Sequence, residues 1–138
     1  MINWLWGIIH APDDFRADPY GELTNQLGHT MLGILLTLFI VGGWREAAGE
    51  MPYRVPVFFV AVFGYLLTVE MLAQRWTPGD SAFDGLMVAF GAGGVLFPLK
   101  EVRPTGTTTL LELNHHLLVW IMSAWAVCLA VRVARRIR

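Results

Sequence analysis

The chain has 138 residues, of which 55% are hydrophobic and 15% are charged. Soluble domains average about 45–50% apolar and about 25% charged residues, so this composition excludes an ordinary soluble domain and indicates a membrane protein. The formal net charge of -1 provides no general basic surface, and nucleic acid is therefore not an expected partner. The length suits a single membrane domain over residues 1–138, because domains usually run to about 100–150 residues.

The first apolar segment, residues 1–11, contains Trp4 and Trp6. It is too short to cross a bilayer, which takes about 20 residues. Indole rings favour the headgroup region, so the segment predicts a short interfacial helix. Asp18 followed by Pro19 then predicts a helix start. The carboxylate can cap free backbone N–H groups, and the missing N–H of proline costs nothing in the first helical turn.

Four longer apolar segments follow, and the length of each lies within the about 17–25 residues that a transmembrane helix needs. They cover residues 27–43, 55–73, 82–99 and 110–131. Short connections between such helices favour antiparallel neighbours. The sequence therefore predicts an all-α polytopic membrane protein, with four transmembrane helices in a bundle and a short N-terminal interfacial helix.

Arginines cluster at the C-terminus, at positions 132, 135, 136 and 138. Positive charges are enriched in cytoplasmic segments, so this end is expected to face the cytoplasm. Four crossings put both termini on one side. We therefore expect an integral protein of the bacterial inner membrane with both termini cytoplasmic.

In a four-span protein, the start of the first span, the end of the second and the start of the third share one membrane face. The polar side chains at these ends are His29, Glu70, Gln74 and Asp84. Ionisable groups inside membranes usually point into the bundle, so these four are expected to form a functional polar cluster. The fourth span begins at the other face, where Glu112, His115 and His116 are expected to form a second polar group.

Helix capping offers a purely structural role for two of these acids. The segments Ser81-Ala82-Phe83-Asp84 and Thr109-Leu110-Leu111-Glu112 both match a capping box. Glu70 has no such explanation, because it is expected near the C-terminal end of its helix, where the dipole disfavours a carboxylate. Paired with His29 or Arg75, Glu70 is the strongest candidate for a functional residue.

Metal binding and catalysis are not expected. Glu112 and His115 form one Glu-x-x-His element, whereas di-iron bundles use this element twice together with further glutamates, and the other acids are expected at the opposite membrane face. Ser81 and Ser123 have no positioned base, so nucleophilic catalysis is not indicated. The sequence predicts no catalytic residue, no metal and no cofactor.

Small residues mark the third expected span at Ala89, Gly91, Gly93 and Gly94. Such a small-xxx-small surface lets helix backbones approach closely in lipid. We expect it to pack within the bundle, with homo-oligomerisation as the alternative.

The polar and small residues also carry a family resemblance. In chain order they are Asn25, His29, Glu70, Gln74, Pro78-Gly79, Asp80-Ser81, Asp84 and Gly91-Ala92-Gly93-Gly94. This order resembles that of the VanZ-like membrane proteins over roughly residues 25–94, although Asn25 and Asp80 stand where that family has Asp and Arg. The resemblance implies a membrane fold with a polar cluster and a link to glycopeptide resistance and envelope processes.

The leading hypothesis is a small non-enzymatic integral membrane protein, VanZ-like in layout, whose polar cluster interacts with a partner, a lipid headgroup or an ion. One alternative is an oligomeric pore such as a phage holin, which fits the small size and the glycine-rich helix. Another is an accessory subunit of a larger membrane complex, and an enzyme acting on a lipid-linked substrate is a more distant alternative. The expected partners are the lipid bilayer and either a second copy of the chain or another membrane protein.

Overall fold

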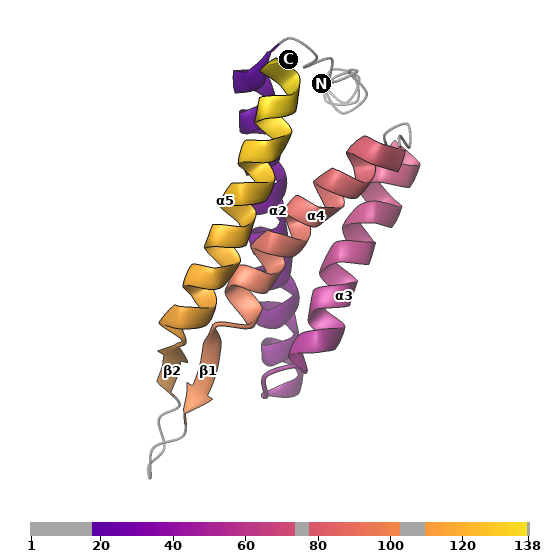
Figure 1. The fold of residues 1–138 in the computed structure, drawn as a ribbon. Coiled ribbons are helices and arrows are strands. Elements are labelled where there is room, and N and C mark those ends of the chain that lie inside the picture. The colour runs from indigo at the N-terminus through magenta and orange to yellow at the C-terminus, as the bar shows by residue number, and fades with distance from the viewer. Residues whose placement is uncertain (1–17, 74–77, 103–109, 138) are drawn as a thin grey trace.

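A computed structural model describes residues 18–73, 78–102 and 110–137 of the chain (Figure 1). Its elements are α2 (Pro19–Ala48), α3 (Arg54–Tyr65), the π-helix η1 (Leu66–Ala73), α4 (Pro78–Leu96), the strands β1 (Leu99–Val102) and β2 (Leu110–Leu113), and α5 (His115–Ile137). The described part of the chain is predominantly helical, as expected. The interfacial helix expected over residues 1–11 lies outside the described residues.

Among the described residues, three helical segments are long and apolar enough to cross a membrane: Pro19–Ala48, Arg54–Met71 and His115–Arg135. Large apolar side chains on these segments, such as Phe39, Phe63 and Trp120, are exposed on the outside of the protein. An extended apolar exterior is what contact with lipid requires, and in water it would be a liability. The three segments indicate an integral membrane protein.

The ends of α2 are set by local capping. The side chain of Asp18 accepts hydrogen bonds from the backbone N–H groups of Tyr20, at 3.1 Å, and Gly21, at 2.9 Å. At the other end, Gly49 adopts a left-handed conformation (φ 73°) and its N–H donates to the carbonyl of Arg45 at 2.9 Å. Because both caps lie beyond the apolar segment, α2 is longer than the expected transmembrane span.

The second expected span changes helix type partway along. It runs as α3 up to Tyr65 and then continues as η1 through Ala73. π-helical turns are rare and often occur at functional sites. Nothing in the apolar pattern indicates this change, because both helix types satisfy backbone groups internally and accept the same side chains.

Helix α4 is the central helix of the bundle. It contacts α2, α3 and α5, and Met87, Val88 and Ala92 on it are fully buried. Figure 1 shows α4 running in the same direction as α2 and crossing it. It occupies the place of the third expected span, but it is not among the three segments that qualify as candidate spans.

The helix at the fourth expected span, residues 110–131, begins later in the structure than the sequence predicts. The first four residues of the expected span form β2, which pairs antiparallel with β1 and places Lys100 opposite Glu112 in the register. Helix α5 begins only at His115, because the side chain of Asn114 accepts a hydrogen bond from the N–H of Leu117 at 3.1 Å. The prediction that Glu112 belongs to a capping box is therefore wrong, because the backbone around Glu112 is paired in a β-hairpin and does not start a helix.

Helices α2 and α4 approach each other closely at two glycines. A β-carbon on Gly33 would lie 2.9 Å from the carbonyl carbon of Val88, and one on Gly91 would lie 3.0 Å from the carbonyl carbon of Thr30. These neighbours are backbone atoms, which cannot rotate out of the way. Only glycine allows this helix pair to pack at the observed distance.

The expected small-residue surface is thus used only in part. A β-carbon on Gly93 would meet side-chain atoms at ordinary contact distances, and one on Gly94 would meet nothing within 4 Å. Ala89 is half-buried. Gly91 allows close packing of two helices within one chain. The sequence pattern does not single out Gly33, which has the same role on α2.

Replacing Gly33 by Ala should lower the stability of the folded protein. Overpacking usually costs about 1–3 kcal/mol, and we expect the upper part of that range because the obstacle is backbone. Thermal unfolding in a mild detergent measures the effect. The control is Gly42→Ala on the exposed part of the same helix, where a β-carbon meets nothing within 4 Å. Equal melting temperatures for the two variants would contradict the close contact.

Candidate functional site

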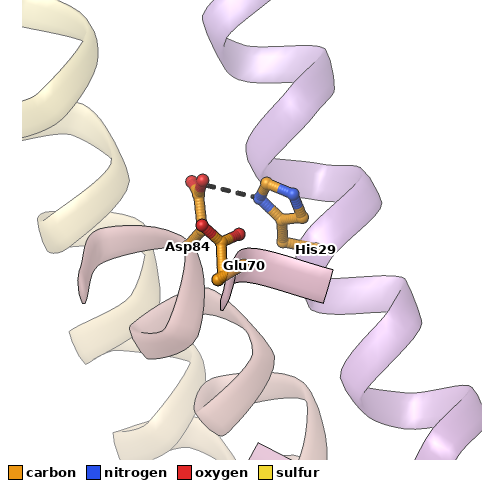
Figure 2. A group of neighbouring side chains, drawn as sticks. All are labelled: His29, Glu70 and Asp84. Carbon is orange, nitrogen blue, oxygen red and sulfur yellow. Dashed lines mark ion pairs between the residues drawn. The ribbon is translucent and has the colours of Figure 1, made fainter. Parts of the chain in front are cut away.

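His29 of α2, Glu70 of η1 and Asp84 of α4 meet inside the bundle. Figure 2 shows the three side chains pointing toward one another from three separate segments. One nitrogen of His29 and one carboxylate oxygen from each acid all lie within 4.8 Å of one another. Glu70 is only 2% exposed and Asp84 8% exposed. We call these three residues the central cluster. Gln74, the fourth residue expected here, lies outside the described residues.

Asp84 does not cap a helix, contrary to the expectation from the sequence. Helix α4 begins at Pro78, so Ser81 already lies within the helix and Asp84 lies beyond its first turn. The Oδ1 atom of Asp84 instead accepts a hydrogen bond from Nε2 of Gln26 at 2.8 Å and lies 3.1 Å from Nδ1 of His29. The capping prediction is wrong because the helix starts before the apolar segment does.

Glu70 of η1 is held in place by Tyr65, the last residue of α3. The hydroxyl of Tyr65 donates a hydrogen bond to Oε1 of Glu70. Residues five apart lie close together where a helix widens to the π form, in which backbone hydrogen bonds span five residues. The ring of Tyr65 also packs against that of His29, with centroids 5.7 Å apart. Arg75, the other partner considered for Glu70, lies outside the described residues.

An ionic group beside the central cluster joins α5 to α2 and α4. Nε of Arg132 donates to Oε1 of Glu22 at 2.8 Å, and Nη2 of Arg132 donates to Oδ1 of Asp80. Gln26 connects this group to the central cluster, because its Nε2 lies 3.2 Å from Oε1 of Glu22 as well as within reach of Asp84. From the sequence, Arg132 is expected only as a cytoplasmic charge. Its partners Glu22 and Asp80 are remote in the chain, so no local pattern indicates the ion pairs.

Two buried polar atoms at the central cluster have no hydrogen-bond partner among the described residues. They are Oε1 of Gln26 and Nδ1 of His29. The latter lies close to Asp84, but the orientation of the ring is not that of a hydrogen bond. Buried polar atoms nearly always have a partner, and leaving one without costs about 1–3 kcal/mol. The cluster is therefore buried, rich in acceptors and not fully satisfied by the residues that the structure describes.

An open groove of about 700 Å³ reaches the central cluster from the surface between α2 and the α3–η1 segment. Residues on its walls include Tyr20, Thr24, Asn25, Leu32 and Val69. His29 and Tyr65 also line the groove, and both contact the buried carboxylates. The groove thus leads from the exterior of the protein to the two side chains that contact the buried carboxylates.

The second expected polar group lies at the other end of the bundle. Glu112 belongs to β2, whereas His115 and His116 are exposed at the start of α5. Figure 1 shows the hairpin and the start of α5 at the end of the bundle opposite the start of α2. Because Glu112 precedes the helix, the Glu-x-x-His element does not lie on one helix face.

Comparisons with known proteins identify no relative. No model of a protein family matches the chain, no curated protein matches it, and no solved structure matches it. The fold and the site define a class: an integral membrane protein with three candidate spanning helices and a buried polar cluster. Its function has to be inferred from the groove and the cluster.

Replacing Arg132 by Gln should destabilise the protein, because it removes the guanidinium group from Glu22, whose side chain is only 2% exposed. Breaking a fully buried ion pair costs about 3–5 kcal/mol. Arg132 is partly exposed, so we expect about 2–3 kcal/mol, measured by chemical unfolding in detergent.

The double variant Glu22→Gln with Arg132→Gln should recover part of this loss, since no buried charge then lacks its counter-charge. The matched control is Arg135→Gln on the exposed part of the same helix. An equal loss in Arg132→Gln and Arg135→Gln would show that the ion pair has no specific role.

Proposed function

We propose that this protein is a small non-enzymatic integral membrane protein, VanZ-like in layout, that binds the headgroup of a membrane phospholipid. The headgroup enters the groove between α2 and the α3–η1 segment and reaches the central cluster. The observation that carries this proposal is an open groove lined by His29 and Tyr65, the two residues that contact the buried carboxylates.

The walls of the groove suit an amphiphilic molecule. Leu32 and Val69 provide apolar contacts, whereas Tyr20, Thr24 and Asn25 provide polar ones near the start of α2. A volume of about 700 Å³ lies within the range of about 300–1,000 Å³ that is usual for small-molecule sites. A headgroup with the adjoining part of its acyl chains therefore fits in size and in polarity.

Glycine widens the groove at its centre. Thr24, Gly28 and Leu32 follow one another at intervals of four residues along α2, so they share one helix face. A β-carbon on Gly28 would meet nothing within 4 Å. The space in front of Gly28 is thus open to a ligand and is not required for helix packing.

We also propose that α4 crosses the membrane together with the three candidate spans, which gives a four-helix bundle with both termini at the cytoplasmic face of a bacterial inner membrane. At about 1.5 Å per residue, its 19 residues extend about 28 Å, close to the about 30 Å of a bilayer core. The contact between Arg132 and Glu22 supports an even number of crossings, because it brings the end of α5 to the start of α2.

An oligomeric pore and an accessory subunit are the alternative functions. Trp120, Val119 and Val127 on α5 are exposed, and they could contact a second copy or another membrane protein in place of lipid. The glycines favour a pore less, since Gly33 and Gly91 are accounted for by packing within one chain. Growth arrest with dye entry upon expression would support the pore and contradict headgroup binding as the main function.

Replacing Gly28 by Leu should block headgroup binding and leave the fold intact, because the added side chain fills the groove. Native mass spectrometry of the protein, released from detergent after incubation with phosphatidylglycerol or phosphatidylethanolamine, measures the retained lipid. We expect the unaltered protein to retain one lipid and Gly28→Leu to bind at least about tenfold more weakly, a change of about 1.4 kcal/mol.

The control for this experiment is Gly42→Leu, which makes the same substitution on the exposed part of the same helix. It should retain lipid as the unaltered protein does. If Gly28→Leu and Gly42→Leu retain lipid equally, the groove is not the binding site.

A further inference from the structure

We propose that His29, Glu70 and Asp84 bind a divalent transition-metal cation, Zn²⁺ in the first instance, at the buried end of the groove. In the sequence, only Glu112 and His115 have a spacing typical of metal ligands. The structure does not place these two residues on one helix face. The central cluster offers a different donor set, contributed by α2, η1 and α4.

The donor atoms have suitable chemistry and nearly suitable spacing. Zn²⁺ takes histidine nitrogen and carboxylate oxygen at about 2.0–2.2 Å, often with three protein ligands and one open position. Ligand atoms around such an ion lie about 3.4 Å apart in a tetrahedral arrangement, by the same bond lengths. His29 Nδ1 and Asp84 Oδ1 already lie 3.1 Å apart. The whole set lies within 4.8 Å, so the third donor would have to move closer by about 1.4 Å to complete such an arrangement.

The unsatisfied atoms at the cluster are a second, independent indication. Gln26 is only 1% exposed, and its amide lies at the cluster because Nε2 donates to Asp84. Its Oε1 nevertheless has no hydrogen-bond partner among the described residues, and neither has Nδ1 of His29, which lies beside Asp84 without the geometry of a hydrogen bond. A cation with a bound water molecule would give the nitrogen a ligand bond and the amide oxygen a hydrogen-bond donor.

The charge balance points the same way. Two buried carboxylates need compensation in a medium of low dielectric constant. In the described part of the chain, Arg132 forms ion pairs with Glu22 and Asp80, whereas Asp84 lies beside His29, which carries a charge only when it is protonated. Glu70 receives a hydrogen bond from the neutral hydroxyl of Tyr65. A divalent cation would neutralise both carboxylates at once.

A cation at this position would also define the headgroup chemistry, and this consequence rests on the proposed function. Its positive charge at the end of the groove would attract the phosphate of a phospholipid. Lipid retention by the unaltered protein is then expected to fall when the protein is treated with EDTA and to recover when Zn²⁺ is restored.

The test uses the full-length protein in detergent, stripped with EDTA and dialysed against Zn²⁺ or Mn²⁺, with bound metal determined by mass spectrometry. We expect one Zn²⁺ per chain and a rise in melting temperature upon binding. Mg²⁺ and Ca²⁺ should not displace it at equal concentration, because they prefer sites made only of oxygen ligands. Failure of the unaltered protein to bind Zn²⁺ stoichiometrically would overturn the proposal without recourse to any variant.

The variants His29→Gln and Asp84→Asn should each weaken Zn²⁺ binding at least tenfold while the protein stays monodisperse on gel filtration. The matched control is His116→Gln, which removes an exposed histidine. Equal losses in His29→Gln and His116→Gln would identify the bound metal as adventitious and overturn the proposal. Absorption bands of Co²⁺ in place of Zn²⁺ provide a second readout, since they change when an inner ligand is replaced.

The cation proposal and the headgroup proposal fail in different ways. Lipid retention that depends on Gly28, in a protein that does not bind Zn²⁺ stoichiometrically, overturns the cation site and leaves the proposed function standing. Stoichiometric Zn²⁺ binding without lipid retention that depends on Gly28 supports the cation site and contradicts the proposed function.

Discussion

The close backbone contact between α2 and α4 is the constraint on which the site depends. Gly33 and Gly91 let the two helices touch without intervening side chains. His29 lies four residues before Gly33, and Asp84 lies four residues before Val88, so each is one turn from the crossing point. Since the two helices run in the same direction (Figure 1), the crossing brings His29 and Asp84 to the same level. Larger residues at the crossing would separate them.

Polar groups extend from this crossing as one connected network. Gln26 donates to Asp84 on one side and to Glu22 on the other, and Arg132 then joins Glu22 to α5. Buried charges are tolerated when they are paired and hydrogen-bonded. The network therefore lets a largely apolar bundle hold carboxylates in its interior, and it ties the last helix to the first.

The π-helical segment supplies the remaining side of the site. The widened turn brings Tyr65 and Glu70 together, and the tyrosine ring then packs on His29. Tyr65, the last residue of α3, and Val69 of η1 both line the groove, so the junction of the two helix types positions a buried acid and also forms one wall of the groove. A regular α-helix over these residues would shift Glu70 around the helix axis and out of this arrangement.

The sequence by itself determined where the apolar helices lie and that His29, Glu70 and Asp84 belong to one end of the bundle. Both are local properties, because lipid-exposed backbone must form helices and each crossing reverses the direction of the chain. Only the tertiary structure decided that Asp84 binds Gln26 and not its own helix terminus, that β2 replaces the first turn of the last helix, and which acids Arg132 contacts. These features depend on the crossing of helices and on partners remote in the chain, which apolar length and spacing do not encode.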